Sequence, residues 1–354
     1  MLLGYNYLPE IAPQLARRTS RIGLGTFPTP VREHGIDGFE IRVKHDELSS
    51  PDYAGNKLRK LEYLLAKARG LGAENIATFG AAGSNHAYAT ALHARRNGLK
   101  PIAFLGPQSK TANIAQMLNH HRRLGTRLIW WHGNRAERSR IIKSTMRSLQ
   151  GRSFVIPMGG TNLYGSLGFV AAAAELSCQI RDGLCPKPER IYLPMGTMGS
   201  VAGLAVGLSL ANIDTTIVAV RVVNTSVAGP DRLFRLCDRL TALCQHLGAG
   251  PISTNWRQKI ELRNEQLGKG YAYATPAANE AKQLAADSLG LMLETTYSAK
   301  ALAALLADLR SNTLASGDGL FWNTYSGPAN APLRINRTPA ALPSELKGYA
   351  SSST

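Results

Sequence analysis

A lysine at the start of a predicted helix is the first candidate for chemistry in this sequence. Lys57 follows a small-residue turn, Ala54-Gly55-Asn56, and leucines then recur at helical spacing at 58, 61 and 65. The positive end of a helix dipole lowers the pKa of an ammonium group, and a neutral amine forms a Schiff base with a carbonyl cofactor such as pyridoxal phosphate. From this stretch alone, an ordinary solvent-exposed lysine is the simpler interpretation.

The second candidate is a glycine-rich segment, Gly196-Thr197-Met198-Gly199-Ser200-Val201-Ala202-Gly203. It follows a predicted strand and opens a predicted helix, so backbone N–H groups and two hydroxyls converge at the positive end of a helix dipole. Such a site suits a phosphate. The segment has neither the Gly-Lys-Ser/Thr of a Walker loop nor the glycine spacing of a Rossmann fold. A tight turn without a ligand fits it equally well.

The third candidate repeats this strand-turn-helix arrangement at Gly83-Ser84-Asn85-His86. Ser84 occupies the expected N-cap position, and the N–H groups behind it are placed to receive a carboxylate. Ordinary helix capping also accounts for Ser84. His86 also fits a polar residue on the helix surface.

Predicted strands and helices alternate through most of the chain. The strands are residues 39–44, 75–79, 101–105, 127–131, 154–160, 190–195, 216–223 and 319–323. The helices are residues 56–70, 85–94, 112–124, 135–149, 167–180, 201–210, 233–247, 277–289 and 299–309. This alternation predicts an α/β protein with parallel sheets and right-handed crossovers. We expect strand 154–160 to open a second sheet and residues 1–23 to be weakly structured, while 252–270 fits either helix or strand.

The composition is that of a globular protein with room for two domains, since 44% of its 354 residues are hydrophobic. The first residues lack a basic stretch followed by a long apolar core, and no run of about 18 uncharged apolar residues occurs. We therefore expect a cytoplasmic protein that binds no membrane. The spacing of the cysteines predicts reduced, mostly buried thiols and no metal site: Cys178, Cys185, Cys237 and Cys244.

The charge is strongly basic, with 41 Lys and Arg against 24 Asp and Glu and a formal net charge of +17. Such an excess suits a nucleic acid or an anionic ligand, or serves only solubility. A dense basic set recurs on predicted helix surfaces, so we expect no nucleic-acid partner: Arg122, Arg123, Arg127, Arg135, Arg138, Arg140, Lys143 and Arg147.

The three candidate segments occur together with further motifs over about residues 24–326. These are Thr29-Pro30, Lys44-His45-Asp46-Glu47-Leu48, Ala54-Gly55-Asn56-Lys57-Leu58-Arg59-Lys60-Leu61-Glu62, Ile156-Pro157-Met158-Gly159-Gly160, Gly165-Ser166-Leu167-Gly168-Phe169, Gly270-Tyr271-Ala272-Tyr273-Ala274-Thr275-Pro276 and Thr296-Tyr297-Ser298-Ala299-Lys300. In this combination the chain resembles the D-cysteine desulfhydrase and 1-aminocyclopropane-1-carboxylate deaminase family. That family belongs to the fold-type II pyridoxal-phosphate enzymes related to the tryptophan synthase β-subunit.

The resemblance implies two domains, each an open twisted parallel sheet, with the active site between them. The large, cofactor-binding domain is expected to comprise residues 1–60 and 161–338, and the small α/β domain residues 61–160. Residues 339–354 are expected to form a flexible tail. The resemblance also implies a homodimer.

The resemblance implies roles for the candidate residues around the cofactor. Lys57 would carry pyridoxal 5'-phosphate and move the substrate proton, while Lys60 would approach the phosphate. Asn85 would donate to the 3′-oxygen of the ring, and Ser298 would face the pyridine nitrogen. The phosphate itself would be bound by Gly196, Thr197, Met198, Gly199 and Ser200.

The substrate side of the site follows from the same resemblance. Ser84 would face the substrate near its carboxylate and Cα, together with Asn85 and His86. Tyr271 and Tyr297 would wall the pocket as catalytic residues, and Thr324 would contact the substrate.

Two positions indicate which reaction is run. The resemblance places an acid after the second pocket tyrosine in the deaminases, and Ser or Thr there in the desulfhydrases; this chain has Ser298. Thr324 is likewise the desulfhydrase choice, where the deaminases have leucine. We therefore expect a lyase that releases sulfide, ammonia and a keto acid from D-cysteine or a similar β-substituted amino acid.

The alternatives are ring opening of the cyclopropane substrate and, from another class, a non-catalytic pyridoxal-phosphate carrier or a basic nucleic-acid-associated relative. The chain also departs from the family at three places. Ala54 replaces a glycine, His45 replaces an arginine and leaves the role of Asp46 open, and the loop Asn323-Thr324-Tyr325-Ser326-Gly327 differs.

Overall fold

The computed structural model of the chain describes residues 2–109, 114–326 and 341–350. Their packing groups the chain into two compact units. The large unit is Met1–Tyr63 with Thr161–Pro328, and the small unit is Leu64–Gly160 with Ala329–Thr354. The boundary at Tyr63 falls inside helix α2 (Asn56–Gly70).

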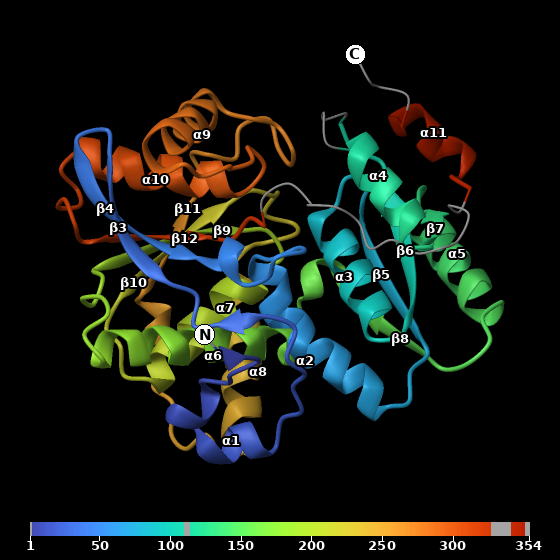
Figure 1. The fold of residues 1–354 in the computed structure, drawn as a ribbon, viewed down its shortest axis with the longest axis horizontal. Helices are drawn as coiled ribbons and strands as arrows, with labels where there is room; N and C mark the ends of the chain where they lie inside the picture. The colour runs from blue at the N-terminus through green and yellow to red at the C-terminus, as the bar shows by residue number, and fades with distance from the viewer. Residues whose placement is uncertain (1, 110–113, 327–340, 351–354) are drawn as a thin grey trace. The chain divides into compact units, whose positions relative to one another are not determined.

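The large unit is built on a six-stranded sheet in the order β11-β10-β9-β12-β4-β3 (Figure 1). All neighbours pair in parallel except β3, which runs antiparallel to β4 at the edge. A short antiparallel pair, β1 with β2, lies outside this sheet. The strands are β1 (Leu2–Leu3), β2 (Thr26–Phe27), β3 (Val31–Ile36), β4 (Phe39–His45), β9 (Arg190–Met195), β10 (Thr216–Arg221), β11 (Ile260–Arg263) and β12 (Gly319–Asn323).

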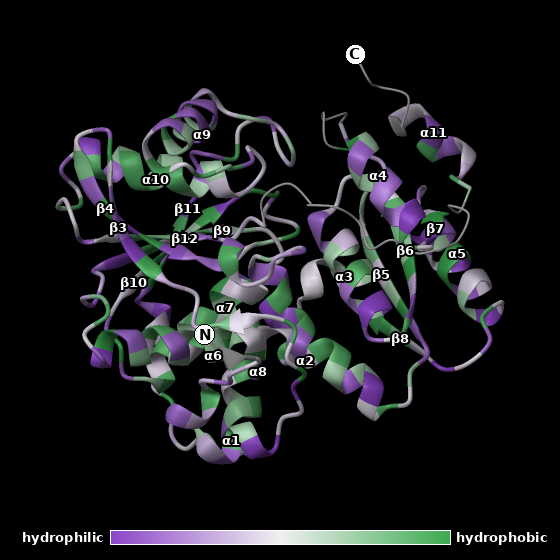
Figure 2. Ribbon diagram, in the orientation of Figure 1, coloured by the Kyte–Doolittle hydropathy of each residue, from purple (hydrophilic) through white to green (hydrophobic). Residues whose placement is uncertain are grey.

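Helices cover both faces of the large sheet, because successive strand residues point to opposite sides. On β9, Ile191 and Leu193 face a core shared with α1 (Pro13–Arg17), α6 (Leu163–Arg181), α7 (Gly199–Leu210) and α8 (Pro230–His246). Tyr192 faces the opposite core, with α9 (Pro276–Leu289) and α10 (Ser298–Arg310). Figure 2 shows the hydrophobic colouring of α7 and α10 where they cover the sheet. Short 3₁₀ turns are η1 (Leu8–Glu10), η2 (Asp46–Leu48) and η4 (Asn255–Arg257).

Glycines allow the central helices to approach very closely. A Cβ at Gly203 of α7 would lie 2.3 Å from the carbonyl oxygen of Ser166 on α6. A Cβ at Gly168 of α6 would lie 2.1 Å from the carbonyl oxygen of Arg59 on α2. Only glycine fits these contacts. The first turn of α2, with its lysines, is thereby fixed against α6.

The small unit is a four-stranded parallel sheet in the order β7-β6-β5-β8. Its elements are β5 (Asn75–Ala81), α3 (Asn85–Arg96), β6 (Lys100–Gly106), α4 (Ile114–Arg123), β7 (Arg127–Trp130), α5 (Arg135–Arg147), β8 (Ser153–Ile156), η3 (Met158–Gly160) and α11 (Ser344–Ala350). On β6, Ala103 and Leu105 face α3, α4 and α11, whereas Ile102 and Phe104 face α5.

The α/β fold with two largely parallel sheets is confirmed, but the expectation that residues 154–160 open the second sheet is wrong. Strand β8 pairs with β5 and completes the small sheet, and residues 158–160 form η3. Pairing partners are set by contacts distant in sequence, so the order of strands along the chain does not reveal them.

Several regular elements occupy stretches where none was predicted. Helix α1 lies within residues 1–23, and the antiparallel strand β3 precedes β4. Residues 252–270, which fit either helix or strand, contain the strand β11. The tail expected to be flexible instead contains α11, with Leu346 fully buried. Leu346 and Tyr349 of this helix pack in one apolar cluster with Leu342, which precedes it, and such a short stripe is not recognised by periodicity. Residues 339–340 and 351–354 of the expected tail lie outside the described residues.

A buried ionic cluster joins α2, β4 and α6 in the large unit. Arg59 donates to both carboxylate oxygens of Asp46 at 2.9 and 2.6 Å and to both oxygens of Glu175 at 2.9 and 3.1 Å. Lys44 donates to Glu175 at 2.5 Å and to the carbonyl oxygen of Thr29 at 2.6 Å. All four charged residues are at most 3% exposed. Two cations therefore balance two carboxylates in the core.

Opposite charges within this cluster stabilise the ionised forms of Glu175 and Lys44. Burial raises the pKa of Glu175, but Arg59 and Lys44 outweigh burial and hold that pKa at about 2. Burial lowers the pKa of Lys44, and Glu175 opposes that shift. The replacement of an arginine by His45 left the role of Asp46 open. In the structure, Asp46 pairs with Arg59.

The apolar helix α6 is explained by its position in the large unit. Among the described helices, it alone is long and apolar enough to cross a membrane, and most of it is buried inside the protein. Its buried residues pack against α7 and the sheet. A core helix needs this composition on all sides.

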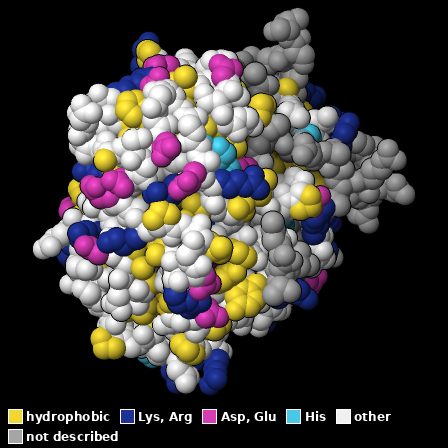
Figure 3. All heavy atoms as spheres, turned by 60° about the vertical axis from the view of Figure 1, so that its left-hand side comes forward, with side chains coloured by type: hydrophobic (Ala, Val, Ile, Leu, Met, Phe, Trp, Pro, Cys, Tyr) yellow, Lys and Arg dark blue, Asp and Glu magenta, His cyan; other side chains and the backbone are white. Residues whose placement is uncertain are grey.

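The surface charge is mixed in sign on the face seen in Figure 3, where Lys and Arg lie among Asp and Glu. The dense basic set lies on α4, β7 and α5 of the small unit, and most of its members are exposed. Two of them have local roles: Arg138 stacks over the Trp131 ring at 4.7 Å, and Arg127 donates to Ser148 at 3.0 Å.

Replacing Glu175 by glutamine should destabilise the protein by about 3 kcal/mol or more, because Arg59 and Lys44 would keep a single carboxylate between them in the core. Urea unfolding of purified protein measures this. Glu74→Gln is the matched control, since Glu74 and Lys100 form an exposed pair at 3.3 Å worth at most about 1 kcal/mol. A loss below about 1 kcal/mol for Glu175→Gln would contradict the structural role of the cluster.

Candidate active site

The turn before α2 fixes the position of Lys57. Gly55 has φ of 84°, and a Cβ there would lie 2.6 Å from the carbonyl oxygen of Thr324. The Gly55 N–H donates to the carbonyl oxygen of Asp46 at 3.0 Å, and the Asn56 N–H donates to that of Thr324 at 3.2 Å. Ala54 does not have positive φ, so an alanine is accommodated where the family has glycine. Strand β12 and η2 therefore both fix the start of α2.

Two lysines with lowered pKa values lie one turn apart on α2. Burial lowers the pKa of Lys57 to about 8, with Glu294 opposing the shift. Burial and the charge of Lys57 lower the pKa of Lys60 well below its usual value. Lys60 Nζ lies 3.4 Å from Thr161 Oγ1, which is 2.7 Å from Thr197 Oγ1. A bound anion would favour the ammonium form of Lys60.

The start of α7 offers the donors for such an anion. Strand β9 ends at Met195, and Met198 then adopts a left-handed conformation with φ of 69° as the N-cap, with no side-chain hydrogen bond to the helix. The leading N–H groups of a helix have no acceptor within it, and they lie at the positive end of its dipole. A Cβ at Gly199 would lie 2.6 Å from Thr161 Oγ1 and 3.0 Å from Lys60 Nζ.

These features fit the phosphate of pyridoxal phosphate. The position that a Cβ at Gly199 would fill is bordered by a hydroxyl and a lysine, and Asn56 Nδ2 lies 3.4 Å from Ser200 Oγ beside it. Backbone N–H groups, two threonine hydroxyls and an ammonium group form a donor set suited to a phosphate. Sequence motifs did not single out Thr161, although its place directly after Gly159-Gly160 is a usable signal.

Two tyrosines lie against this turn. The hydroxyls of Tyr271 and Tyr297 are 2.9 Å apart, and the rings meet edge to face at 5.9 Å between centroids. A Cβ at Gly196 would lie 3.2 Å from the Tyr297 ring. Burial raises the pKa of both phenols, so they are neutral hydrogen-bonding groups at ordinary pH.

Glu294 is a site residue that sequence reasoning missed. Its carboxylate accepts the N–H groups of Thr296 at 2.8 Å, Tyr297 at 2.9 Å and Ser298 at 2.9 Å. It thus caps α10 and interacts electrostatically with Lys57. Burial raises its pKa, and the backbone donors oppose this. An acid four residues before a helix start is a usable sequence signal for this cap.

Ser298 and Thr324, the two positions expected from the resemblance to separate the reactions, are both buried. The Ser298 hydroxyl accepts the Glu294 N–H at 3.2 Å and lies 3.3 Å from Glu294 Oε1. Thr324 follows β12, and its carbonyl oxygen holds the Asn56 N–H beside Lys57. Gly327 of the altered loop lies outside the described residues.

The remaining predicted residues lie together at the start of α3 in the small unit. Ser84 is the N-cap, and its hydroxyl accepts the Ala87 N–H at 3.2 Å, as the sequence indicated. Asn85 begins the helix. His86 is buried rather than on the surface, and its Nε2 lies 2.9 Å from Thr78 Oγ1. His86 is therefore placed to orient this turn.

His45, where the family has arginine, has acquired its own partners. Its Nδ1 lies 2.5 Å from Glu47 Oε1, and its Nε2 lies 3.1 Å from Nε2 of His34 on the edge strand β3. Burial is the main cause that lowers the pKa of His34, and His45 adds to it. The replacement is thus accommodated locally.

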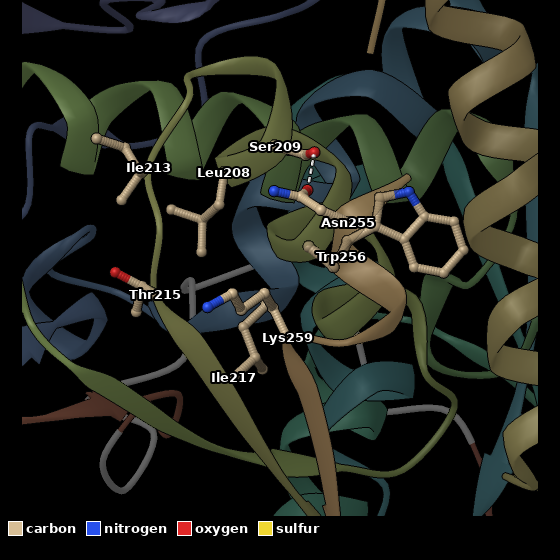
Figure 4. A pocket seen from close by; sticks show the side chains of 9 residues that line it. Leu208, Ser209, Ile213, Thr215, Ile217, Asn255, Trp256 and Lys259 are labelled. Atoms are coloured by element: carbon tan, nitrogen blue, oxygen red, sulfur yellow. Dashed lines mark hydrogen bonds between the residues drawn. The ribbon is translucent and has the colours of Figure 1, made fainter. Parts of the chain in front are cut away.

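A small cavity lies at the opposite end of α7 from the phosphate-binding turn (Figure 4). Its lining includes Leu208, Ser209, Thr215, Asn255 and Lys259. Ser209 Oγ donates to Asn255 Oδ1 at 2.8 Å, and Lys259 pairs with Asp214 at 2.8 Å. Since α7 has 12 residues, the two ends are separated by roughly 18 Å. This cavity is not part of the candidate site.

The fold and the site together define a pyridoxal-phosphate enzyme of fold type II. Residues 22–321 match the family described as pyridoxal-phosphate dependent enzyme, and the chain belongs to this family. The predicted family resemblance, the cofactor and the enzymatic nature of the protein are thereby confirmed.

Several relatives cover most of the chain. It is 34% identical over 316 residues to the nocardicin C-9' epimerase of Nocardia uniformis subsp. tsuyamanensis, covering 86% of this chain and 92% of the relative. It is 32% identical over 331 residues to the D-cysteine desulfhydrase of Salmonella paratyphi A, covering 88% and 95%. It is 32% identical over 300 residues to a putative 1-aminocyclopropane-1-carboxylate deaminase of Thermotoga maritima, covering 82% and 92%.

A solved structure described as an ACC deaminase homologue has the same fold. It aligns with a TM-score of 0.77 at 26% identity, covering 91% of this chain and 96% of the other.

Adding one methyl group at the phosphate-binding turn should weaken cofactor binding. We expect Gly199→Ala to raise the dissociation constant of pyridoxal phosphate about tenfold or more, because the new Cβ occupies the position next to Thr161 and Lys60. Titration of the apoprotein measures this constant. Gly35→Ala is the matched control, since a Cβ there meets nothing within 4 Å, and Arg135→Ala tests the exposed basic set. Unchanged affinity in Gly199→Ala would refute the assignment.

Lys57 should react with an amine-specific reagent at lower pH than an ordinary lysine. Its lowered pKa means that the neutral, reactive form dominates above about pH 8 rather than above the usual 10.5. Mass spectrometry of apoprotein labelled across a pH series gives the midpoint for the Lys57 peptide, with a free lysine amide in the same sample as reference. Coincident midpoints for the two amines would contradict the lowered pKa.

Proposed function

We propose that this enzyme catalyses β-elimination from D-cysteine or a similar β-substituted amino acid, giving a keto acid, ammonia and sulfide. The observation that carries the proposal is the start of α10, where Ser298 occupies the position expected to face the pyridine nitrogen. The relative named D-cysteine desulfhydrase, at 32% identity, supports it. Bound pyridoxal phosphate supplies the electron sink, and the residues of the chain supply placement and proton transfer.

Lys57 is proposed as the group that holds the cofactor and takes the proton from the substrate Cα. A pKa of about 8 leaves roughly a tenth of the amine neutral at pH 7, far more than an ordinary lysine has, and a general base must be neutral to take a proton. Glu294 lies close enough to stabilise the ammonium form once the proton has arrived. Lys60, Thr161 and the start of α7 would hold the phosphate at the carboxyl edge of the large sheet.

Ser298 is proposed to favour elimination of a good leaving group. A hydroxyl donates a hydrogen bond without giving up its proton, so it leaves a pyridine nitrogen unprotonated and the electron sink weaker. The nearby acid, Glu294, is engaged by three N–H groups of the backbone. A weaker sink suffices when the β-substituent is a thiol.

The substrate contacts are proposed from the resemblance. Ser84, Asn85 and His86 would receive the substrate carboxylate and the 3′-oxygen of the cofactor, and the neutral phenols of Tyr271 and Tyr297 would form the wall. We also propose, from the resemblance, a homodimer that functions in the cytoplasm without nucleic acid.

Ring opening of the cyclopropane substrate is the second candidate. It is favoured by the ACC deaminase homologue with a TM-score of 0.77 and by the relative of that name in Thermotoga maritima. An epimerase is also among the relatives, so the test must follow the configuration of the substrate as well as product release.

We expect a higher kcat/KM for sulfide release from D-cysteine than for 2-oxobutanoate release from the cyclopropane substrate. Ser298→Glu should lower the D-cysteine value about tenfold, because an acid favours a protonated pyridine nitrogen, whereas Ser298→Thr should retain it. Steady-state assays of both reactions, with chiral analysis of unreacted substrate and light scattering of the same sample, provide the comparison. A higher value for the cyclopropane substrate, or racemisation without sulfide, would overturn the proposal.

A further inference from the structure

The C-terminal helix α11 packs on α4 and shares a buried cluster with the residues that flank the turn carrying Ser84 and Asn85. Leu346 of α11 is fully buried in a cluster that contains Ala82 and Ala87. These two alanines flank residues 83–86 on either side. All members of the cluster belong to the small unit. A helix near the end of the chain therefore belongs to the same apolar cluster as both flanks of this turn.

A chain of hydrogen bonds joins α11 to the same turn. The Tyr349 hydroxyl donates to the carbonyl oxygen of Gln108 at 3.0 Å and accepts the Gln108 N–H at 3.3 Å. The side chain of Gln108 then accepts the Gly83 N–H through Oε1 at 3.1 Å. Tyr349 thus fixes the backbone of Gln108, whose side chain fixes the backbone next to Ser84.

The turn has little room to shift on the side of Gln108. A Cβ at Gly83 would lie 2.9 Å from Ile114 Cγ1 and 3.2 Å from Gln108 Nε2. On the other side, a Cβ at Gly80 would lie 2.4 Å from the Ser84 Cβ. Close packing of this kind transmits a displacement of Gln108 directly to Ser84 and Asn85.

We propose that Tyr349 and Gln108 are positioning residues of the active site, and that α11 keeps the 83–86 turn in its binding conformation. The inference rests on the proposed roles of Ser84 and Asn85. Neither Tyr349 nor Gln108 contacts the substrate in this proposal; both act through Gly83. Sites held by a second layer of hydrogen bonds lose function when that layer loosens, even though the reacting groups remain.

A purely structural role for α11 predicts a different pattern. If the helix only covers apolar surface, loss of the Tyr349 hydroxyl lowers stability slightly and leaves cofactor binding unchanged. If it positions the turn, the hydroxyl matters to the 83–86 backbone while the cluster around Leu346 stays intact. The two roles are therefore separable with a substitution that removes one oxygen atom.

The experiment compares Tyr349→Phe with Glu345→Gln, an exposed position on the same helix. In apoprotein and holoprotein, amide hydrogen exchange of residues 83–86 should quicken about threefold to tenfold in Tyr349→Phe, the range that one hydrogen bond provides. The dissociation constant of pyridoxal phosphate should rise by a similar factor. Gln108→Ala should give the same effects, and the double variant should add little to either single one.

Unchanged exchange at residues 83–86 in Tyr349→Phe, or full additivity of the two substitutions, would overturn the inference. Exchange in the apoprotein is independent of any reaction, so it is read even if the enzyme does not release sulfide. If exchange quickens while cofactor affinity and kcat/KM stay unchanged, the turn does not serve the site and the inference also fails. Failure of the proposed function alone appears as absent sulfide release in the unaltered enzyme.

Discussion

The buried pairing of Arg59 with Asp46 and Glu175 is the interaction on which the rest of the site depends. Arg59 is two residues beyond Lys57 on α2, Asp46 follows β4, and Glu175 belongs to α6. One guanidinium therefore fixes a helix start to a strand end and to the central helix of the large unit. Its planar fork uses both partners in two-point contacts at 2.6–3.1 Å. Removing four charges from water is costly, and close geometry with matched charge offsets that cost.

The charge balance of this cluster also bears on the pKa values of Lys57 and Lys60, the two neighbouring lysines of α2. The negative charge of Asp46 and Glu175 is already matched by Arg59 and Lys44. The neutral cluster therefore does not offset the lowering of the pKa values of Lys57 and Lys60 by burial. Of these two lysines, Glu294 opposes the shift for Lys57. A site that holds excess positive potential beside a helix N-terminus is suited to a phosphate dianion and a nucleophilic amine at once.

Much of the fold could be predicted from local patterns, and most of what was missed depends on distant contacts. The helical spacing after Lys57 and the strand that became β9 are properties of short windows, and both were found at their residues. The edge strand β3 and the pairing of β8 with β5 are settled by long-range partners. Helix α11 has only seven residues, so its apolar stripe is shorter than the window that periodicity requires.

The site residues divide in the same way, into those with a local sequence signal and those that depend on distant contacts. Lys57, Gly199 and Ser84 sit at helix starts, and a helix start has a sequence signature because backbone donors need partners there. Glu294 and Thr161 could not be found in this way, because each contributes through an interaction with a lysine of α2 that is distant in sequence. In the proposed reaction, the choice between elimination and ring opening would depend on whether the pyridine nitrogen of the cofactor carries a proton. Ser298, at the start of α10, is the residue proposed to face that nitrogen, and the nearby Glu294 carboxylate accepts three backbone N–H groups. In this proposal the cap that starts α10 at Ser298 keeps Glu294 engaged with the backbone, so a helix cap would contribute to the strength of the electron sink.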